Sequence, residues 1–593
     1  MGSFPVFDGA SKVFPIYSRA NIGEIFPDPI SPLNASAGFQ ANLEPGWRAA
    51  FVSCGVWDHD LYDATVEHNI VPAFGGYLYI NMSLMRLFGV RVPGATPGSV
   101  DLQYFGDMPG IPSYESERRD FDENPAYSEK AGAWLAHEVL GATDLAAYDA
   151  DRRTVAGIRA RRPDLASLSD RELRQRITSF GDVLQGVFER HISASLKSGI
   201  GLGGIARITE AAGRPDLALT LVSGIGEVDS AEPSTQMWHL SRLARTGPVA
   251  AHFDAGGRDL FERLGADPET RDFADALDRF LRTWDFRGPS EWEIRATTWG
   301  TDPALVLATV DRLRLVSEDE APARKNAERA RQRQAASAEL RTLFAGDETA
   351  VAQFDAVLHA AELWLRGRER GRTTAAMLIH EVRLAARELG RRAAEAGHLD
   401  HVAQIFMLFA GELDTWLDDP AAHLDILRER ERTYLRLFDY EPPFVTVGRP
   451  GPVAEWRRRS DRSAAPLRPG DAITGVPGCG GTARGRARVL TAPDDPSALE
   501  PGDILVAPIT DPSWTPLFVA AAAVVVDVGA PFSHAAIISR ELGIPCVVSA
   551  TDATARIPDG ALIEVDGTTA AVTVLEVVDV TAAVTAAEAE GAP

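Results

Sequence analysis

The sequence predicts a multidomain α+β protein in which a large, mainly helical region is followed by a small α/β domain. Three observations support this fold class. The chain has 593 residues, enough for about two to four domains of ordinary size. In the middle of the chain, apolar residues recur at helical spacing, as in Phe354, Leu358, Ala361 and Leu365. After Gly470, short β-branched runs bounded by Gly, Pro or Asp replace that pattern.

Composition along the chain predicts where the domains lie. Residues 1–440 are expected to be mainly helical, with residues 1–110 more irregular because they are rich in Pro, Gly and aromatic residues. The following segment has several prolines, no periodicity and an arginine cluster, so it is expected to be a hinge or linker. This linker is predicted at 441–469 and contains Arg457, Arg458, Arg459 and Arg462. The α/β domain is predicted at 470–578, with strands near 504–506, 523–526, 545–548 and 562–565. A flexible tail is predicted at 579–593.

Charge and cysteine content exclude several functional classes. The net charge is −24 and the isoelectric point is near 5.0, which argues against a nucleic-acid or anionic-membrane partner. Cys54, Cys479 and Cys546 are far apart in the sequence and form no CxxC pair, so neither disulfides nor a zinc site are indicated. The N-terminus has no signal-peptide pattern, and the apolar run at 514–526 is too short to span a bilayer. A cytoplasmic protein is expected.

The candidate catalytic residue is His534. An apolar strand ends at Asp527, a turn containing Gly529 follows, and a helix is predicted from Ser533 to Leu542. His534 then lies at an exposed helix start, where unpaired backbone N–H groups favour an anion and disfavour the imidazolium form. A neutral imidazole nitrogen there is a potential nucleophile. The alternative is that His534 is a polar residue at a helix start with no chemical role.

Residues 529–545, Gly-Ala-Pro-Phe-Ser-His-Ala-Ala-Ile-Ile-Ser-Arg-Glu-Leu-Gly-Ile-Pro, resemble the phosphohistidine motif of the family that includes phosphoenolpyruvate synthase, pyruvate phosphate dikinase and rifampin phosphotransferase. The resemblance covers about residues 469–575, including 501–506, 510–518 and 565–567. It implies a swivelling phosphohistidine domain in which His534 carries a phosphoryl group. It also implies support for that group from Ser533, Phe532, Gly529 and Arg540.

Two departures from the family pattern concern the acceptor. The pyruvate-linked members usually carry Thr where Phe532 stands, which suggests a less polar acceptor. Only 59 residues follow His534, whereas the barrel that binds phosphoenolpyruvate in those members needs about 250 residues. Pyruvate is therefore not expected as the partner substrate.

The N-terminal region resembles the acceptor-binding region of rifampin phosphotransferase through residues 19–24, 29–33, 76–81, 287–293 and 368–372. The resemblance implies a set of polar residues that line an acceptor pocket; the alternative is that they form ion pairs between helices. These candidates are Asn21, Glu24, Arg287, Glu291, Arg368, Glu369 and Arg372. The family's Gly-His-Arg string reads Asp285-Phe286-Arg287 here, which leaves the general base unassigned.

The resemblance also implies a phosphoryl donor. Fused relatives place an ATP-grasp domain of several hundred residues before the motif at Asn21, but only 20 residues precede it here. A separate ATP-grasp subunit is therefore expected to bind ATP and Mg²⁺ and to phosphorylate His534, as in phenylphosphate synthase. The family reaction yields AMP and phosphate. The histidine domain would then swing to an acceptor hydroxyl, with the linker as hinge.

Three functions remain open from the sequence. The first is transfer to a small aromatic acceptor of the phenol or cresol type, the second is transfer to an antibiotic or terpenoid alcohol, and the third is a non-catalytic phosphocarrier. A pocket of at least about 300 Å³ facing the histidine domain would favour an enzyme. Two other patterns are weaker: residues 199–204 match GxGxxG but follow a segment, 191–198, that is predicted to be helical and not a buried strand, and 478–485 is predicted to be a turn between strands. His398 and His401 lack partners for a metal.

Overall fold

The computed structural model describes residues 7–60, 70–105, 110–461, 464–491, 498–531 and 533–577. Phe532, Arg462 and the predicted tail at 579–593 lie outside these residues. Helices make up 58% of the structure, and a mixed sheet occupies the C-terminal region, which agrees with the predicted α+β class. Within the described part, no helix combines the length and apolar composition needed to cross a membrane.

The helical body, residues 7–440, contains most of the helices. The first six are α1 (Ile22–Ile25), α2 (Glu44–Ser53), α4 (Met82–Arg91), α5 (Pro97–Phe105), α6 (Pro125–Trp134) and α7 (Ala146–Ala160). The next six are α8 (Asp170–Thr178), α9 (Gly181–Ala211), α10 (Leu217–Leu221), α11 (Glu232–Leu243), α12 (Gly247–Ala255) and α13 (Leu260–Ala266). The last six are α14 (Arg271–Trp284), α15 (Ala304–Leu313), α16 (Pro322–Leu343), α17 (Glu348–Glu395), α18 (Leu413–Asp418) and α19 (Leu424–Leu437).

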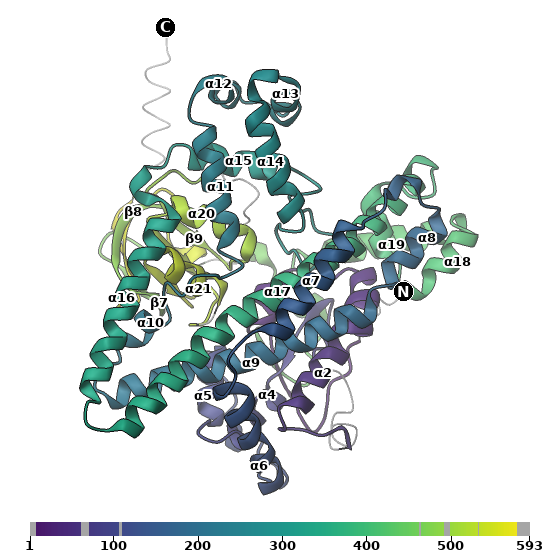
Figure 1. Cartoon of the computed structure of the whole chain (residues 1–593). Helices are drawn as coiled ribbons and strands as arrows, with labels where there is room; N and C mark the ends of the chain where they lie inside the picture. Colours follow the sequence, from purple (N-terminus) through teal and green to yellow (C-terminus); the bar gives the residue numbers. More distant parts are fainter. Residues whose placement is uncertain are drawn as a thin grey trace.

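The 48-residue helix α17 runs through the middle of the body and packs along α9 (Figure 1). Glycine allows these two helices to approach closely. A Cβ atom on Gly201 of α9 would lie 2.8 Å from the Cα of Ala361, and one on Gly371 of α17 would lie 2.9 Å from the Cα of His191. The predicted GxGxxG segment lies inside α9, so its glycines pack a helix and do not form the strand-to-helix turn of a dinucleotide site.

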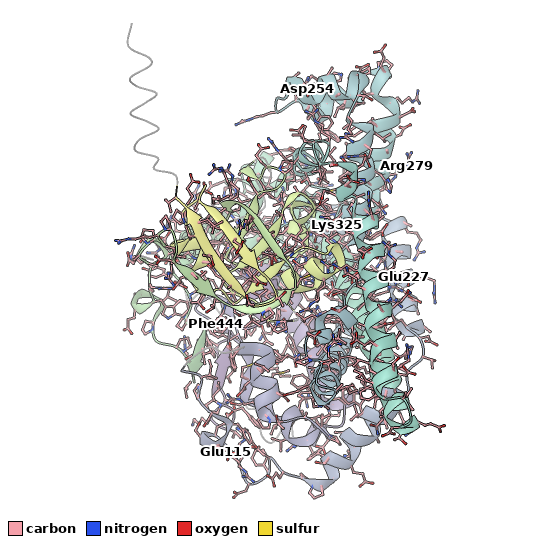
Figure 2. All side chains as sticks on the ribbon, turned by 90° about the vertical axis from the view of Figure 1, so that its left-hand side faces the viewer. Glu115, Glu227, Asp254, Arg279, Lys325 and Phe444 are labelled. Carbon is pink, nitrogen blue, oxygen red and sulfur yellow. The ribbon has the colours of Figure 1, made fainter. Side chains whose placement is uncertain are left out.

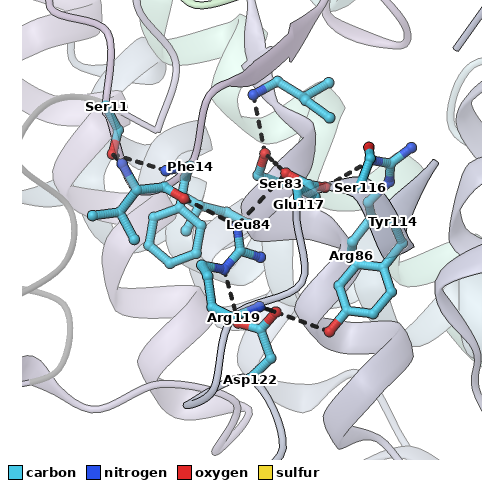
Figure 3. Close-up of polar contacts among 12 residues, drawn as sticks. Ser11, Phe14, Ser83, Leu84, Arg86, Tyr114, Ser116, Glu117, Arg119 and Asp122 are labelled. Atoms are coloured by element: carbon cyan, nitrogen blue, oxygen red, sulfur yellow. Dashed lines mark hydrogen bonds and ion pairs between the residues drawn. The ribbon is translucent and has the colours of Figure 1, made fainter. Parts of the chain in front are cut away.

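The N-terminal part of the body is held by a small sheet and a buried polar network. Strands β1 (Ile16–Ser18) and β4 (Ile80–Asn81) pair, and strands β2 (Ala73–Phe74) and β3 (Tyr77–Leu78) form a hairpin. Figure 3 shows the network: Glu117 accepts hydrogen bonds from Ser83 and from Arg86, the latter at 2.7 Å, and Asp122 accepts one from Arg119 at 2.9 Å. The irregular segment predicted at 1–110 is thus short strands and helices around buried ion pairs.

The first half of the predicted linker is tied to the body. Strand β5 (Val445–Val447) adds to β1, and the Phe444 carbonyl accepts a hydrogen bond from Arg19 N–H at 2.8 Å. Figure 2 shows Phe444 at the lower edge of the C-terminal sheet. The hinge at 441–469 stays a prediction. Strand β5 holds the first part of this segment against the body.

The sheet unit, residues 470–577, is an eight-stranded mixed sheet of order β6-β13-β12-β8-β9-β10-β11-β7. Its neighbours β8 to β11 are parallel and the remaining pairs are antiparallel. The strands are β6 (Ala472–Thr474), β7 (Val476–Cys479), β8 (Thr482–Val489), β9 (Ile504–Ala507), β10 (Ala523–Val526), β11 (Cys546–Val548), β12 (Leu562–Asp566) and β13 (Ala571–Glu576). All four strands predicted here are confirmed. In the glycine-rich segment at 478–485, Gly480 and Gly481 form the turn between β7 and β8, and the other residues lie in these two strands.

Side-chain alternation gives the sheet two apolar faces. Val524 and Val526 point into the cluster that includes the body's core, whereas Val525 points into a separate cluster of the sheet unit alone. The first face is covered by α20 (Thr515–Ala520) and α21 (His534–Leu542), and α22 (Ala553–Arg556) lies beside β9 and β10. Figure 1 shows this unit in yellow beside α16 and below the α11–α15 arm.

Candidate functional site

His534 is the first residue of helix α21, directly after the loop that leaves buried strand β10. Ser533 is the N-cap, and its hydroxyl accepts a hydrogen bond from Ala536 N–H at 3.4 Å. Gly543 ends the helix in the left-handed conformation. The helix is therefore confirmed, but the expectation that His534 is exposed is wrong. The side chain is 2% exposed, because the sheet unit is docked against the body.

Two threonine hydroxyls bracket the imidazole of His534. Thr510 Oγ1 lies 3.2 Å from Nδ1, and Thr515 Oγ1 lies 3.1 Å from Nε2. The ring of Phe518 meets it edge to face, 5.9 Å between centroids. Both threonines lie in the segment 510–518 that the sequence comparison matched, but sequence reasoning did not assign them to the site. They fix the ring plane and satisfy both ring nitrogens.

The imidazole of His534 is held neutral. Burial lowers its pKa well below the usual value, and the positive charges of Arg372, Arg287 and Arg368 lower it further. A neutral ring has one nitrogen that carries a lone pair, here within hydrogen-bond distance of a threonine hydroxyl, and this is the form required of a nucleophile toward phosphorus. The same arginines would stabilise the negative charge of a phosphoryl group on that ring.

These arginines differ in their partners. Arg287 donates to Glu291 at 2.8 Å and to Thr373 at 2.7 Å, and Arg368 donates to Glu369 at 2.8 Å. Four of the seven predicted pocket residues thus form ion pairs, but each pair lies within one segment, and neither links two helices as the alternative interpretation expected.

Arg372 is different. It is 3% exposed, and within the described ranges its guanidinium makes no hydrogen bond or ion pair. The positive charge of Arg372 acts on the carboxyl groups of Glu24, Glu291, Glu369 and Asp511, but none of them forms a direct ion pair with it. A bound anion would supply that direct partner. The same charge lowers the pKa of His534.

The remaining predicted pocket residues come from helix α1 and the residue before it. Glu24 accepts a hydrogen bond from His534 N–H at 3.4 Å, so a carboxylate of the body occupies the N-terminus of α21. Burial raises the pKa of Glu24 to about 7, although Arg368, Arg372 and the His534 N–H lower it. Asn21 has a positive φ of 62° and shares a hydrogen bond with Tyr104.

Gly529 and Arg540 support the local fold. Gly529 packs closely, since a Cβ there would lie 3.1 Å from the Cβ of Val548. Arg540 is buried and donates to the Gly478 carbonyl at 2.8 Å, so its side chain holds β7 and does not face the phosphorylation site. Cys479 and Cys546, far apart in sequence, are register partners on β7 and β11 and are free thiols.

An apolar cavity of about 660 Å³ lies on one side of the docking interface. Pro531, Val476 and Pro477 of the sheet unit form part of its wall. Among the predicted residues, Asn21, Arg368 and Arg372 border it, whereas Arg287, Glu291 and Glu369 do not. Most of the remaining wall is apolar and comes from α1, α2, α4, α5 and α9, including Ile22, Trp47, Met85, Phe88, Ile192 and Ile200.

A second cavity of about 600 Å³ lies on the other side of the interface, and its wall has more charged side chains than the wall of the first. Glu24 of the body and Thr510 and Asp511 of the sheet unit line it, together with Arg457 and Arg459 of the predicted hinge. His534 itself borders neither cavity, but Thr510, which contacts its ring, lines the second, and Pro531 of its own loop lines the first.

Docking is held by hydrogen bonds that the sheet unit makes across the interface. Asp511 accepts from Ser290 N–H at 2.9 Å. At the far end of α21, Glu541 accepts from Ile225 N–H at 3.0 Å and from Asn326 Nδ2 at 2.8 Å. These contacts position the histidine against the body and would have to break for the unit to move away.

The comparisons with known proteins match this arrangement. The model of the mobile domain of PEP-utilising enzymes matches residues 499–570, and the model of the rifampicin phosphotransferase fourth domain matches residues 191–369. The chain is thus similar to the PEP-utilising enzymes, and rifampicin phosphotransferases are among its relatives, in line with the resemblance seen in the sequence.

Individual relatives extend this similarity over most of the chain. An uncharacterized protein of Mycobacterium tuberculosis is 30% identical over 95% of this chain and 62% of its own length. A rifampicin phosphotransferase of Streptomyces sviceus is 27% identical over 95% of this chain and 62% of its own length. A phosphoenolpyruvate synthase of Aeropyrum pernix is 39% identical over 22% of this chain and 17% of its own length. The chain spans about three-fifths of the first two relatives.

Proposed function

We propose that this chain is a phosphotransferase in which His534 receives a phosphoryl group and passes it to the hydroxyl of an apolar acceptor in the 660 Å³ cavity. One observation carries the proposal. A buried, neutral histidine stands at the interface beside Arg372, a buried cation with no partner in the described structure, and Arg372 borders that cavity. The nucleophile, the anion site and the acceptor site are thus adjacent.

The size of the cavity bears on the acceptor. A phenol or cresol, the first choice from the sequence, would fill only a small part of it. Sites of about 300–1,000 Å³ are typical for drug-sized ligands, so the volume favours an acceptor larger than one aromatic ring. We therefore propose a polycyclic phenol or a large apolar alcohol, which includes the antibiotic and terpenoid classes. The cavity also favours an enzyme over a non-catalytic phosphocarrier, because its volume is larger than the minimum of about 300 Å³ expected for a small-molecule site.

The phosphoryl donor is proposed to be ATP, bound with Mg²⁺ by a separate ATP-grasp subunit and converted to AMP and phosphate. In the described part of the chain, no group of three or more His, Cys, Asp or Glu side chains could hold a metal ion. In this proposal Mg²⁺ is bound together with ATP by the partner. Movement of the sheet unit between the two sites would let one histidine serve both and keep water from the phosphoramidate.

The test is to incubate the chain with an ATP-grasp partner and ATP labelled in its phosphates, then to screen apolar hydroxyl compounds of increasing size. Label on the chain should be acid-labile and base-stable, as phosphoramidates are. It should move to the acceptor and leave His534 unmodified. Label found on Ser533, or on no residue, would overturn the proposal, and transfer to water alone would leave only a phosphocarrier.

A further inference from the structure

His191 on helix α9 borders the apolar cavity, and no motif in the sequence singles it out. Its side chain is 4% exposed. The ring packs edge to face against Trp292, 5.5 Å between centroids, and lies 5.9 Å from the ring of Phe188. Gly371 of α17 lies directly against its backbone. The orientation of this ring is therefore fixed by packing.

The hydrogen bond at Nδ1 determines which ring nitrogen carries the proton. Nδ1 lies 3.2 Å from the backbone carbonyl oxygen of Arg368. A carbonyl oxygen can only accept, so Nδ1 must donate and Nε2 must carry the lone pair. Burial lowers the pKa of His191 to about 3, and the charges of Arg368 and Arg372 contribute, so the ring is neutral.

Nε2 is open toward the cavity. Over the described residues no group hydrogen-bonds to this nitrogen, and it is not one of the buried side-chain atoms left without a partner. It is therefore an unoccupied hydrogen-bond acceptor on the wall of the acceptor cavity. A bound hydroxyl is the kind of group that such an atom orients.

The two histidines share their electrostatic surroundings. Arg368 and Arg372 lower the pKa of His191 and also that of His534. Arg368 holds His191 through its carbonyl, and Arg372 borders the same cavity. A phosphoryl group on His534 and a hydroxyl bound at His191 would therefore approach the same pair of arginines.

Other proton acceptors are less suited. Glu210 also borders the cavity, but its side chain is exposed to solvent. Glu24 lines the second cavity and already accepts a hydrogen bond from His534 N–H. His380 is fully buried and directs Nε2 toward Asp285 at 3.5 Å. His191 combines a neutral ring, a free lone pair and the acceptor cavity.

We propose that Nε2 of His191 accepts the hydrogen bond of the acceptor hydroxyl and takes its proton during phosphoryl transfer. This inference rests on the proposed function. The O–P bond forms as the N–P bond breaks, and the electron pair returns to the ring nitrogen of His534, whose other nitrogen keeps its hydrogen. The proton on His191 then passes to the phosphate ester. The incoming phosphoryl charge favours the imidazolium form and so makes His191 a stronger base at that moment.

The experiment separates the half-reactions without a partner protein. Potassium phosphoramidate, which phosphorylates histidine side chains directly, is used to load the full chain. Discharge of His534 to 4-methylphenol or 4-nitrophenol is then followed by mass spectrometry. The variants are His191→Phe, which keeps the aromatic packing, and His191→Gln, which keeps a hydrogen-bond acceptor but not a base. His398→Gln, at an exposed histidine remote from the cavity wall, is the control.

We expect all variants to load His534 equally. Discharge to 4-methylphenol should slow by roughly 10²–10⁴-fold in His191→Phe, the range for general base catalysis. His191→Gln should restore acceptor KM but not kcat. The defect should shrink for 4-nitrophenol, because its more acidic hydroxyl needs less help from a base. The wild-type rate should fall as the pH drops through the pKa of His191, and the variants should lack this step.

Two results would overturn the inference in distinguishable ways. If wild type and His191→Phe discharge to both phenols at equal rates, His191 has no catalytic role and the proposed function stands. If wild-type phosphohistidine transfers to water but to no hydroxyl compound, the proposed function falls and the role of His191 falls with it.

Discussion

The two cavities at the docking interface are similar in volume, about 660 Å³ and about 600 Å³, but differ in the charge of their walls. One is walled mainly by apolar side chains of α1, α2, α4 and α9, with charged side chains at Arg207, Glu210, Arg368 and Arg372. The other is lined by carboxylates, arginines and prolines from the body, the predicted hinge and the sheet unit.

The difference indicates separate tasks for the two sides. An apolar wall excludes water from an acceptor hydroxyl and strengthens the few charges at its edge. The polar side includes the segments that must separate if the sheet unit moves, such as Asp511 against Ser290. Polar, wettable surfaces separate at a lower cost than apolar ones.

The largest expected effect comes from His534→Ala, which removes the proposed nucleophile. Transfer should fall below detection, because no covalent route remains for the phosphoryl group. Folding should survive, since Ser533 remains the helix cap and the lost threonine contacts are worth about 1 kcal/mol each. Labelled ATP with the ATP-grasp partner, together with thermal unfolding, checks both points. Label that persists in the alanine variant would refute the phosphohistidine mechanism.

Much of the sheet unit could be predicted from the sequence because its signals are local. Strands 504–507 and 523–526 are continuous β-branched runs, and Ser533 and Gly543 mark both ends of α21. His534 was found for the same reason. The burial of His534 was missed, since it depends on the helical body that covers it and not on its neighbours in sequence.

The rest of the site depends on contacts between distant residues. Thr510 and Thr515 reach the His534 ring only after α20 packs beside α21. The tautomer of His191 depends on its hydrogen bond to the backbone carbonyl of Arg368, 177 positions away in the sequence. The sequence also could not assign different roles to Arg372 and Arg368, because an arginine on a helix can either form an ion pair or line a pocket. Only the folded structure shows that, in the described part, Arg368 forms an ion pair and Arg372 does not.

The second prediction tests the charged edge of the apolar cavity. Arg372→Gln should slow discharge to the acceptor by roughly 10²–10³-fold, the usual effect of removing one group that stabilises transition-state charge. It should also raise the pKa of His534, because a nearby positive charge is lost. The control is Arg391→Gln, an exposed arginine on the same helix. Rates measured after phosphoramidate loading give the first effect, and histidine NMR gives the second. Unchanged discharge would mean that Arg372 binds no phosphoryl group.

The third prediction concerns the polar side. The pKa of Glu24 is raised to about 7 by burial, so the docked fold favours its protonated form. That stabilisation is complete below the ordinary carboxyl pKa and is lost as pH rises through about 7.

Glu24→Gln should therefore match wild type near pH 5 and be more stable near pH 8, by at most roughly 3 kcal/mol. Thermal unfolding at the two pH values measures this difference. Equal stability of the two proteins at both pH values would show that Glu24 remains ionised in the docked state.

The smallest expected effect tests whether the acceptor binds in the apolar cavity. Gly203 of α9 borders the apolar cavity, and a Cβ there would meet only Arg207 Nη1, at 3.7 Å. Gly203→Leu should therefore extend into open cavity space while favouring the helix by about 0.5–1 kcal/mol. Transfer to a polycyclic phenol should weaken about tenfold, mainly through KM, whereas transfer to 4-methylphenol should hardly change because it needs little of the volume. Arg457→Gln in the second cavity should alter neither acceptor. If Gly203→Leu weakens both acceptors equally, or if Arg457→Gln discriminates between them, the acceptor does not occupy the apolar side.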